Sequence, residues 1–296
     1  MNGPAVLDGG VAAAHHLLVL PGDIAPDELE ALAVSRSADA GWAAPGELQL
    51  MTGVHLTGPW SLDGDVRTAL GLPGWAEQAY LLVCPAQRGG PLPPELRGMD
   101  PVVDAFPGGV PEGVEAEALG HVRAFARRLR GGLRLAGTGA VVVPDADSAV
   151  DLTVLAPVWL EHDACLQVLA GVLPSVHSLL DDIPEELAGN ELEGYAIATD
   201  TVDGDIVVVD VAGLEHPPTV LRGTDWAYGG VVAYEIRWRP SSPEQVFVAR
   251  QAPAVRHARA EAAAVIERAA AALHGIVGGE ICDDDGFLVA PEDLAG

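Results

Sequence analysis

Two arginines near the end of an apolar stretch form the best candidate for a binding site in this sequence. Arg237 and Arg239 flank Trp238, and Glu235 precedes Arg237 by two residues. A guanidinium can donate two parallel hydrogen bonds to a carboxylate or a phosphate. We therefore expect a small anionic ligand to bind here, in a site made of Asp151, Thr153, Glu235, Arg237 and Arg239.

Two other interpretations of these residues stay open. In one, the arginines form ordinary cross-strand ion pairs with Asp151, each worth a few tenths of a kcal/mol. In the other, the chain is an enzyme, in which an arginine holds an anionic metabolite and Glu235 or Asp151 moves a proton. An enzyme needs a pocket and an acid or histidine with a displaced pKa, whereas a binding module needs a broad, flat, covered face.

Motifs for metals, cofactors and nucleophiles do not emerge from the sequence. The nine histidines lack H-x-H and H-E-x-x-H spacing, and the adjacent His15 and His16 point to opposite faces of a predicted strand. Asp283–Gly286 lacks the alternation of a calcium loop. Gly137–Gly139 follows a predicted helix, the reverse of a phosphate-binding order. The sequence predicts no metal site, no cofactor and no catalytic nucleophile.

Composition narrows the classes of partner. The chain has 43 acidic and 16 basic residues and a net charge of −27, which repels nucleic-acid backbones and anionic lipid surfaces. The apolar stretch Ala12–Leu20 is far shorter than the ~20 residues that cross a bilayer. The isolated thiols of Cys84, Cys165 and Cys282 suit a reducing compartment. We expect a cytoplasmic protein that binds neither nucleic acid nor membrane.

An internal repeat organises the 296 residues. Leu17–Ala33 and Leu152–Ala170 each predict an apolar strand, a break at proline and a helix with acidic residues near its start. A predicted strand from Glu47 or Glu193 then runs to an Asp-Gly turn, weaker and partly helical at Asp63–Gly64 than at Asp203–Gly204.

A matched passage follows in both halves. Trp75-Ala76 leads to the strand AYLLVCP, and Trp226-Ala227 leads to AYEIRWRP. Each strand precedes a long amphipathic helix, ending at Gly131-Gly132 in one half and at Gly275 in the other. The final predicted strands are GAVVVPD and GEICDDDGFLVAPED.

Both halves therefore predict strand, helix, strand, strand, helix, strand, over residues 15–145 and 150–293. This order resembles the ferredoxin-like βαββαβ unit, in which right-handed crossovers place both helices on one face of an antiparallel sheet. We predict an α+β tandem duplication of that unit, with domains at 1–148 and 149–296. The Pro/Gly-rich segment 85–111 is an insertion in the first domain.

Side-chain alternation predicts what the other face of each sheet carries. In the second unit Leu152, Val154, Ala156, Val158, Tyr234, Ile236 and Trp238 face the helices, and the candidate site lies on the other face. In the first unit that face holds Leu81 and Val83, with either Leu18 and Leu20 or Leu17 and Val19. This apolar face needs a cover, which the other unit, the Pro/Gly-rich segment or a second subunit could provide. We expect sheet-to-sheet packing of the units or a homodimer, in a non-catalytic binding or assembly module.

Overall fold

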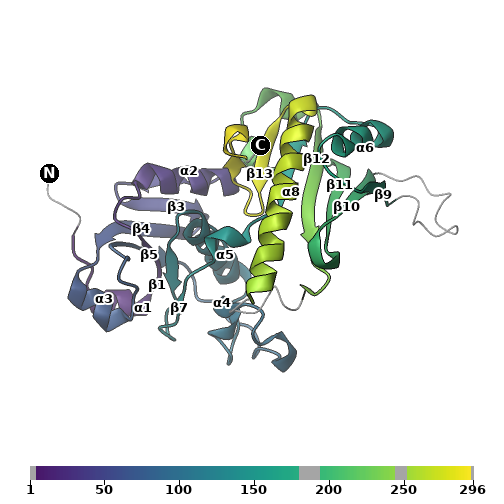
Figure 1. Cartoon of the computed structure of the whole chain (residues 1–296). Coiled ribbons are helices and arrows are strands. Elements are labelled where there is room, and N and C mark those ends of the chain that lie inside the picture. Colours follow the sequence, from purple (N-terminus) through teal and green to yellow (C-terminus); the bar gives the residue numbers. More distant parts are fainter. Residues whose placement is uncertain (1–4, 180–193, 244–251, 295–296) are drawn as a thin grey trace. The chain divides into compact units, whose positions relative to one another are not determined.

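The chain has two compact units, Met1–Ser148 and Ala149–Gly296. The computed structural model describes residues 5–179, 194–243 and 252–294. Each unit combines helices with one antiparallel sheet of seven strands, which confirms the predicted α+β class (Figure 1).

The sheet of the first unit runs β2-β3-β4-β5-β1-β6-β7. Its strands are β1 (His16–Leu20), β2 (Gly41–Ala44), β3 (Glu47–Met51), β4 (Val54–Ser61), β5 (Gln78–Val83), β6 (Gly132–Arg134) and β7 (Val141–Val142). Its helices are α1 (Gly9–Ala14), α2 (Pro26–Arg36), α3 (Gly64–Leu70), α4 (Pro101–Asp104) and α5 (Gly113–Arg128). Helix α2 opens at Pro26 with Asp27 and Glu28 in its first turn, a start favoured by the helix dipole.

The sheet of the second unit runs β14-β13-β8-β12-β11-β10-β9. Its strands are β8 (Leu152–Ala156), β9 (Val176–Ser178), β10 (Gly194–Asp200), β11 (Ile206–Leu214), β12 (Val231–Arg239), β13 (Glu280–Asp283) and β14 (Leu288–Val289). Its described helices include α6 (His162–Ala170) and α8 (Pro253–Val277). Both sheets share a central order of three strands, β5-β1-β6 in the first unit and β12-β8-β13 in the second. In each unit the first strand lies between the strand that precedes the long helix and the strand that follows it. This shared order is consistent with two similar units.

Several predicted boundaries in the first unit were wrong. The strand that follows α5 is β6, whereas GAVVVPD supplies only the two-residue edge strand β7. The glycines there do more than end a helix: a Cβ on Gly131 would lie 2.5 Å from the carbonyl oxygen of Val19, so glycine permits the close approach to β1. Asp63 caps α3 by accepting from the N–H of Val66, and the predicted turn is therefore a helix start.

Two further boundaries differ from expectation. The segment from Glu47 forms a complete hairpin, β3 and β4, where one strand was predicted. Helix α8 passes through Gly275 and ends at Val277, and the next residue, Gly278, has a positive φ of 65°, which glycine adopts easily. A helical pattern around one glycine can continue, because an isolated glycine costs only about 1 kcal/mol.

The core of the second unit lies between its sheet and its helices. Figure 1 shows α8 along one face of the sheet, and α6 packs beside it. Leu152, Val154, Ala156, Tyr234, Ile236 and Trp238 are buried on this face, as side-chain alternation predicted. Val158 is an exception, because it lies beyond the end of β8 and is exposed. On the opposite face, Leu155 and Ala233 pack against Leu221 and Ala227 of the β11–β12 connection.

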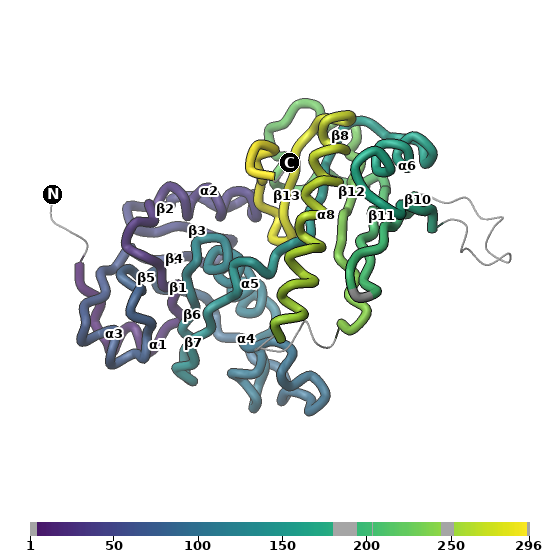
Figure 2. Tube along the Cα trace, viewed as in Figure 1, coloured from purple at the N-terminus to yellow at the C-terminus, as the bar shows by residue number. Residues whose placement is uncertain are grey.

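The apolar face of the first sheet is covered from within its own unit. Leu17, Val19 and Leu81 pack against residues of α1 and α3, which lie side by side (Figure 2). This patch therefore does not need the other unit, the insertion or a second subunit to cover it. Helices therefore lie on both faces of the first sheet rather than on one, and the apolar face no longer argues for a homodimer.

Candidate functional site

Three of the predicted site residues meet on one face of the second sheet. Glu235 lies on β12 and is paired in register with Thr153 on β8 and with Asp210 on β11. Arg237, two residues further along β12, shares the face of Glu235 because strand side chains alternate. β12 has neighbours on both sides, so these side chains project from the middle of a sheet and not from its edge.

The ion pair of Arg237 runs along the strand and not across it. Its Nη2 lies 2.5 Å from Oε2 of Glu235, and the two side chains are 40% and 36% exposed. This contact uses one of the five N–H donors of the guanidinium. Among the described residues no second hydrogen bond or ion pair to Arg237 is found.

Asp151 serves the backbone and not the arginines. Its Oδ1 accepts a hydrogen bond of 2.8 Å from the N–H of Trp238, so the side chain extends the pairing of β8 with β12 by one bond. Burial raises the pKa of Asp151, and the bond from Trp238 and the charges of Arg237 and Arg239 lower it only in part. Arg239 is exposed at the last residue of β12, opposite Ile206.

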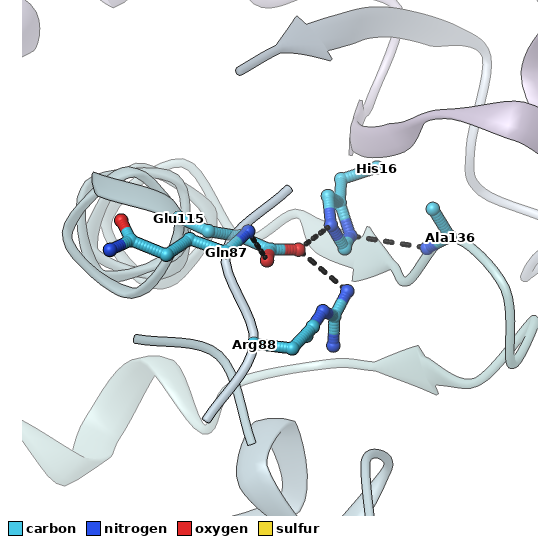
Figure 3. Close-up of polar contacts among 5 residues, drawn as sticks. All are labelled: His16, Gln87, Arg88, Glu115 and Ala136. Atoms are coloured by element: carbon cyan, nitrogen blue, oxygen red, sulfur yellow. Dashed lines mark hydrogen bonds and ion pairs between the residues drawn. The ribbon is translucent and has the colours of Figure 1, made fainter. Parts of the chain in front are cut away.

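A second polar cluster lies in the first unit, and sequence analysis missed it. Glu115, in the first turn of α5, is 1% exposed. Its Oε1 accepts from Nε2 of His16 at 3.0 Å and from Nη2 of Arg88 at 2.6 Å, and its Oε2 accepts from the N–H of Gln87 at 2.7 Å (Figure 3). Three hydrogen bonds, one of them from a cation, stabilise a buried carboxylate.

The ring of His16 is held at both nitrogens. Nδ1 accepts from the N–H of Ala136 at 3.1 Å, which leaves the ring proton on Nε2 to donate to Glu115 (Figure 3). Burial lowers the pKa of His16 more than Glu115 raises it. The ring is neutral, and neither nitrogen is available to a substrate.

Aromatic contacts complete this cluster. The guanidinium of Arg88 lies 3.8 Å above the centre of the Phe106 ring, a cation–π distance. The ring of Phe106 meets His16 edge to face at 6.1 Å. Cys84 lies close enough to sense both charges, and burial with the charge of Glu115 raises the pKa of its thiol to about 11. The thiol is unreactive, and both carboxylate oxygens already accept hydrogen bonds. We therefore interpret the cluster as structural: it connects the insertion to β1 and α5.

The signal for this cluster was weak in the sequence. His16 and Glu115 are 99 residues apart, and Glu115 is one of 43 acidic residues. No local spacing joins them to Arg88. One clue was present: Glu115 follows Val114 and precedes Ala118 near the apolar stripe of a predicted helix, where a buried acid needs a partner.

Metal centres and membrane spans were also sought in the parts of the chain that the structure describes. No group of three or more His, Cys, Asp or Glu side chains there is arranged to hold a metal ion. No described helix combines the length and the apolar character needed to span a bilayer. Comparison with protein-family models, with curated proteins and with solved structures found no match to the chain.

Proposed function

We propose that the chain is a non-catalytic binding module, built from two ferredoxin-like copies, that holds a small anionic ligand on the second sheet through Arg237 and Arg239. The observation that carries the proposal is the state of Arg237. Its guanidinium projects from a central strand, is 40% exposed and spends one donor on Glu235. A carboxylate or phosphate would receive the free donors as a bidentate pair.

The strand orders support the duplicated fold. A ferredoxin-like sheet runs in the order fourth, first, third, second strand, with a helix after the first and the third. β6-β1-β5-β4 and β13-β8-β12-β11 follow that order, with α2 and α5 or α6 and α8 as the helices. The remaining strands extend both edges in the same way: β3-β2 and β10-β9 on one side, β7 and β14 on the other.

The acidic side chains around Arg237 limit the charge of the ligand. Thr153 adds a hydroxyl beside Glu235, and Asp210 places a second carboxylate opposite it. Like charges placed opposite one another across strands repel. Arg237 relieves that repulsion in the free protein, and a ligand anion would compete with Glu235 for it. The ligand we expect is therefore small and singly charged, because a larger negative charge meets both acids.

One observation favours the enzyme alternative. Asp151 has a raised pKa, and only its Oδ1 is hydrogen bonded among the residues that the structure describes. An acid with a displaced pKa beside an anion-binding arginine is the arrangement that proton transfer requires. In that case Asp151 transfers the proton and Arg237 orients the anionic metabolite.

A thermal-shift panel tests the proposed binding site. Wild type, Arg237→Ala and the control Arg256→Ala, an exposed arginine on α8, are heated with acetate, benzoate, phosphate and sulfate at constant ionic strength. Binding to the native state raises the melting temperature in proportion to RT ln(1 + [L]/Kd). We expect at least one anion to stabilise wild type and the control and to leave Arg237→Ala unchanged. Equal stabilisation of all three, or of none, contradicts the proposal.

A further inference from the structure

A buried arginine in the first unit has no counter-charge. Arg134, on β6, is 8% exposed. No acidic side chain pairs with it within residues 5–179, 194–243 and 252–294. Its one hydrogen bond runs from Nη1 to the carbonyl oxygen of Ala12 at 3.4 Å, a long contact, and Nε is sealed from solvent without a partner. A buried cation in this state is costly unless something compensates it.

The free end of this guanidinium faces a glycine turn. Nη2 is the nearest atom to a Cβ built on Gly139, at 3.6 Å, and unlike Nε it is not sealed from solvent. The turn between β6 and β7 carries Gly137 and Gly139 at φ of 78° and 70°. The N–H groups of Gly137 and Thr138 have no acceptor among the described residues. One cationic donor thus lies beside a hairpin turn in which two N–H groups have no acceptor among the described residues.

Apolar side chains lie beside Gly132, on the same strand as Arg134. Gly132 shares the sheet face of Arg134, two residues earlier on β6. A Cβ built on Gly132 would lie 3.5 Å from Cη2 of Trp75 and 3.4 Å from Cγ2 of Val143. Trp75 is 36% exposed and Val143 is 52% exposed. The same face of β6 therefore carries Arg134 near the turn and, two residues earlier, a glycine beside exposed aromatic and aliphatic side chains.

We propose that Arg134 is the centre of a second ligand site, which binds a small organic carboxylate. The carboxylate accepts from Nη2 of Arg134 and from the amides of Gly137 and Thr138, and the apolar part of the ligand contacts Trp75 and Val143. A single negative charge suits the site because the chain carries a net charge of −27, which opposes multiply charged anions. Burial lowers the pKa of Arg134, as expected for a guanidinium that lacks a counter-ion in the free protein.

The site is tested with benzoate, acetate and phosphate as probes, by differential scanning fluorimetry at constant ionic strength. We expect benzoate to stabilise wild type and the exposed-arginine control Arg97→Met. In Arg134→Met the benzoate shift is reduced, and in Arg134→Met/Arg237→Ala, which lacks both proposed sites, it is lost. The ligand-free Arg134→Met protein is at least as stable as wild type because the uncompensated buried charge is gone. A benzoate shift that is equal in Arg237→Ala and in Arg134→Met/Arg237→Ala, or the absence of any shift in Arg237→Ala, overturns the proposal.

A second variant tests the apolar part without touching the arginine. Trp75→Ala is expected to weaken benzoate binding about fivefold and to change acetate binding by less than about twofold, since only benzoate has an apolar body to bury. Phosphate that binds as tightly as benzoate, with no effect of Trp75→Ala, rules out a carboxylate site. Because Arg134 and Arg237 belong to different units, the Arg237→Ala protein retains this benzoate shift if the two sites are independent.

Discussion

Glu115 and His16 are joined by a hydrogen bond of 3.0 Å between Oε1 and Nε2, although 99 residues separate them in the chain. The same carboxylate binds Arg88, so one buried charge fastens the insertion, a helix and the first strand of the sheet. Removal of that carboxylate leaves three donors, on His16, Arg88 and the backbone of Gln87, without this acceptor.

Replacement of this carboxylate tests its structural role. Glu115→Ala is expected to lower the free energy of unfolding by roughly 3 kcal/mol, because the variant strands Arg88 and His16 without their shared acceptor. Urea unfolding followed by circular dichroism measures the change. Glu117→Ala, an exposed acid on the same helix, is the control and should change stability by less than about 0.5 kcal/mol. Equal effects of the two variants would show that Glu115 contributes no more to the free energy of unfolding than an exposed acid does.

The lowered pKa of His121 makes the stability of the protein depend on pH. Burial and the nearby charge of Arg36 lower the pKa of His121 to about 4, and its Nδ1 accepts from Nε of Arg36 at 3.2 Å. Between pH 6.5 and 4 the unfolded chain binds a proton at this residue and the folded chain does not, so stability falls as the pH falls through that window. His121→Gln should lose less stability than wild type over the same range, by about 2–3 kcal/mol.

Urea unfolding at pH 7, 6, 5 and 4 measures this difference. His257→Gln replaces an exposed histidine on α8 and should follow wild type at every pH. A pH profile of His121→Gln that runs parallel to wild type would falsify the assignment of a depressed pKa to His121.

The hydroxyl of Tyr234 fixes the segment that follows β8. It donates to the carbonyl of Val158 at 2.8 Å and accepts from the N–H of Leu160 at 2.9 Å, while its ring is fully buried. Tyr234→Phe leaves both backbone groups without this partner and should cost about 1–3 kcal/mol. Thermal and urea unfolding measure the loss. Tyr228→Phe, at a residue that is 78% exposed, serves as the control and is expected to be neutral.

Asp151 separates the binding module from the enzyme. Asp151→Asn keeps an oxygen to accept the N–H of Trp238 and removes the charge near Arg237. A binding module should then hold its anion as tightly as wild type or several-fold more tightly, because a neighbouring negative charge is gone. Calorimetric titration measures the affinity. Lost affinity with a preserved fold would show that the carboxylate itself contacts the ligand, as the enzyme alternative requires.

Local patterns predicted the elements better than their ends. Alternating residues such as Val154 and Tyr234 identified the buried face of the second sheet, because strand periodicity follows directly from backbone geometry. Gly275 suggested a helix end that lies inside α8, and nothing in the local sequence showed that Gly131 lies against β1. A glycine can end a helix, sit inside one or admit a neighbouring strand, and tertiary contact decides which.

Long-range contacts were beyond local patterns. The cover of the first sheet by α1 and α3, and the cluster around Glu115, join segments whose sequences carry no shared motif. Within the candidate site, side-chain alternation correctly placed Thr153, Glu235 and Arg237 on one face. It could not predict the partners. The pairing of Arg237 with Glu235 depends on side-chain rotamers, and the bond from Trp238 to Asp151 depends on where the strands end.

Isothermal titration of wild type and Arg237→Lys with the anion whose thermal shift is lost in Arg237→Ala is the most direct measurement of the proposed function. Lysine keeps the charge but cannot form the planar pair of hydrogen bonds. We predict one site in wild type and an affinity at least about tenfold lower in Arg237→Lys, the change that 1.4 kcal/mol produces. Equal affinity in the two proteins would contradict the claim that the guanidinium of Arg237 binds the ligand.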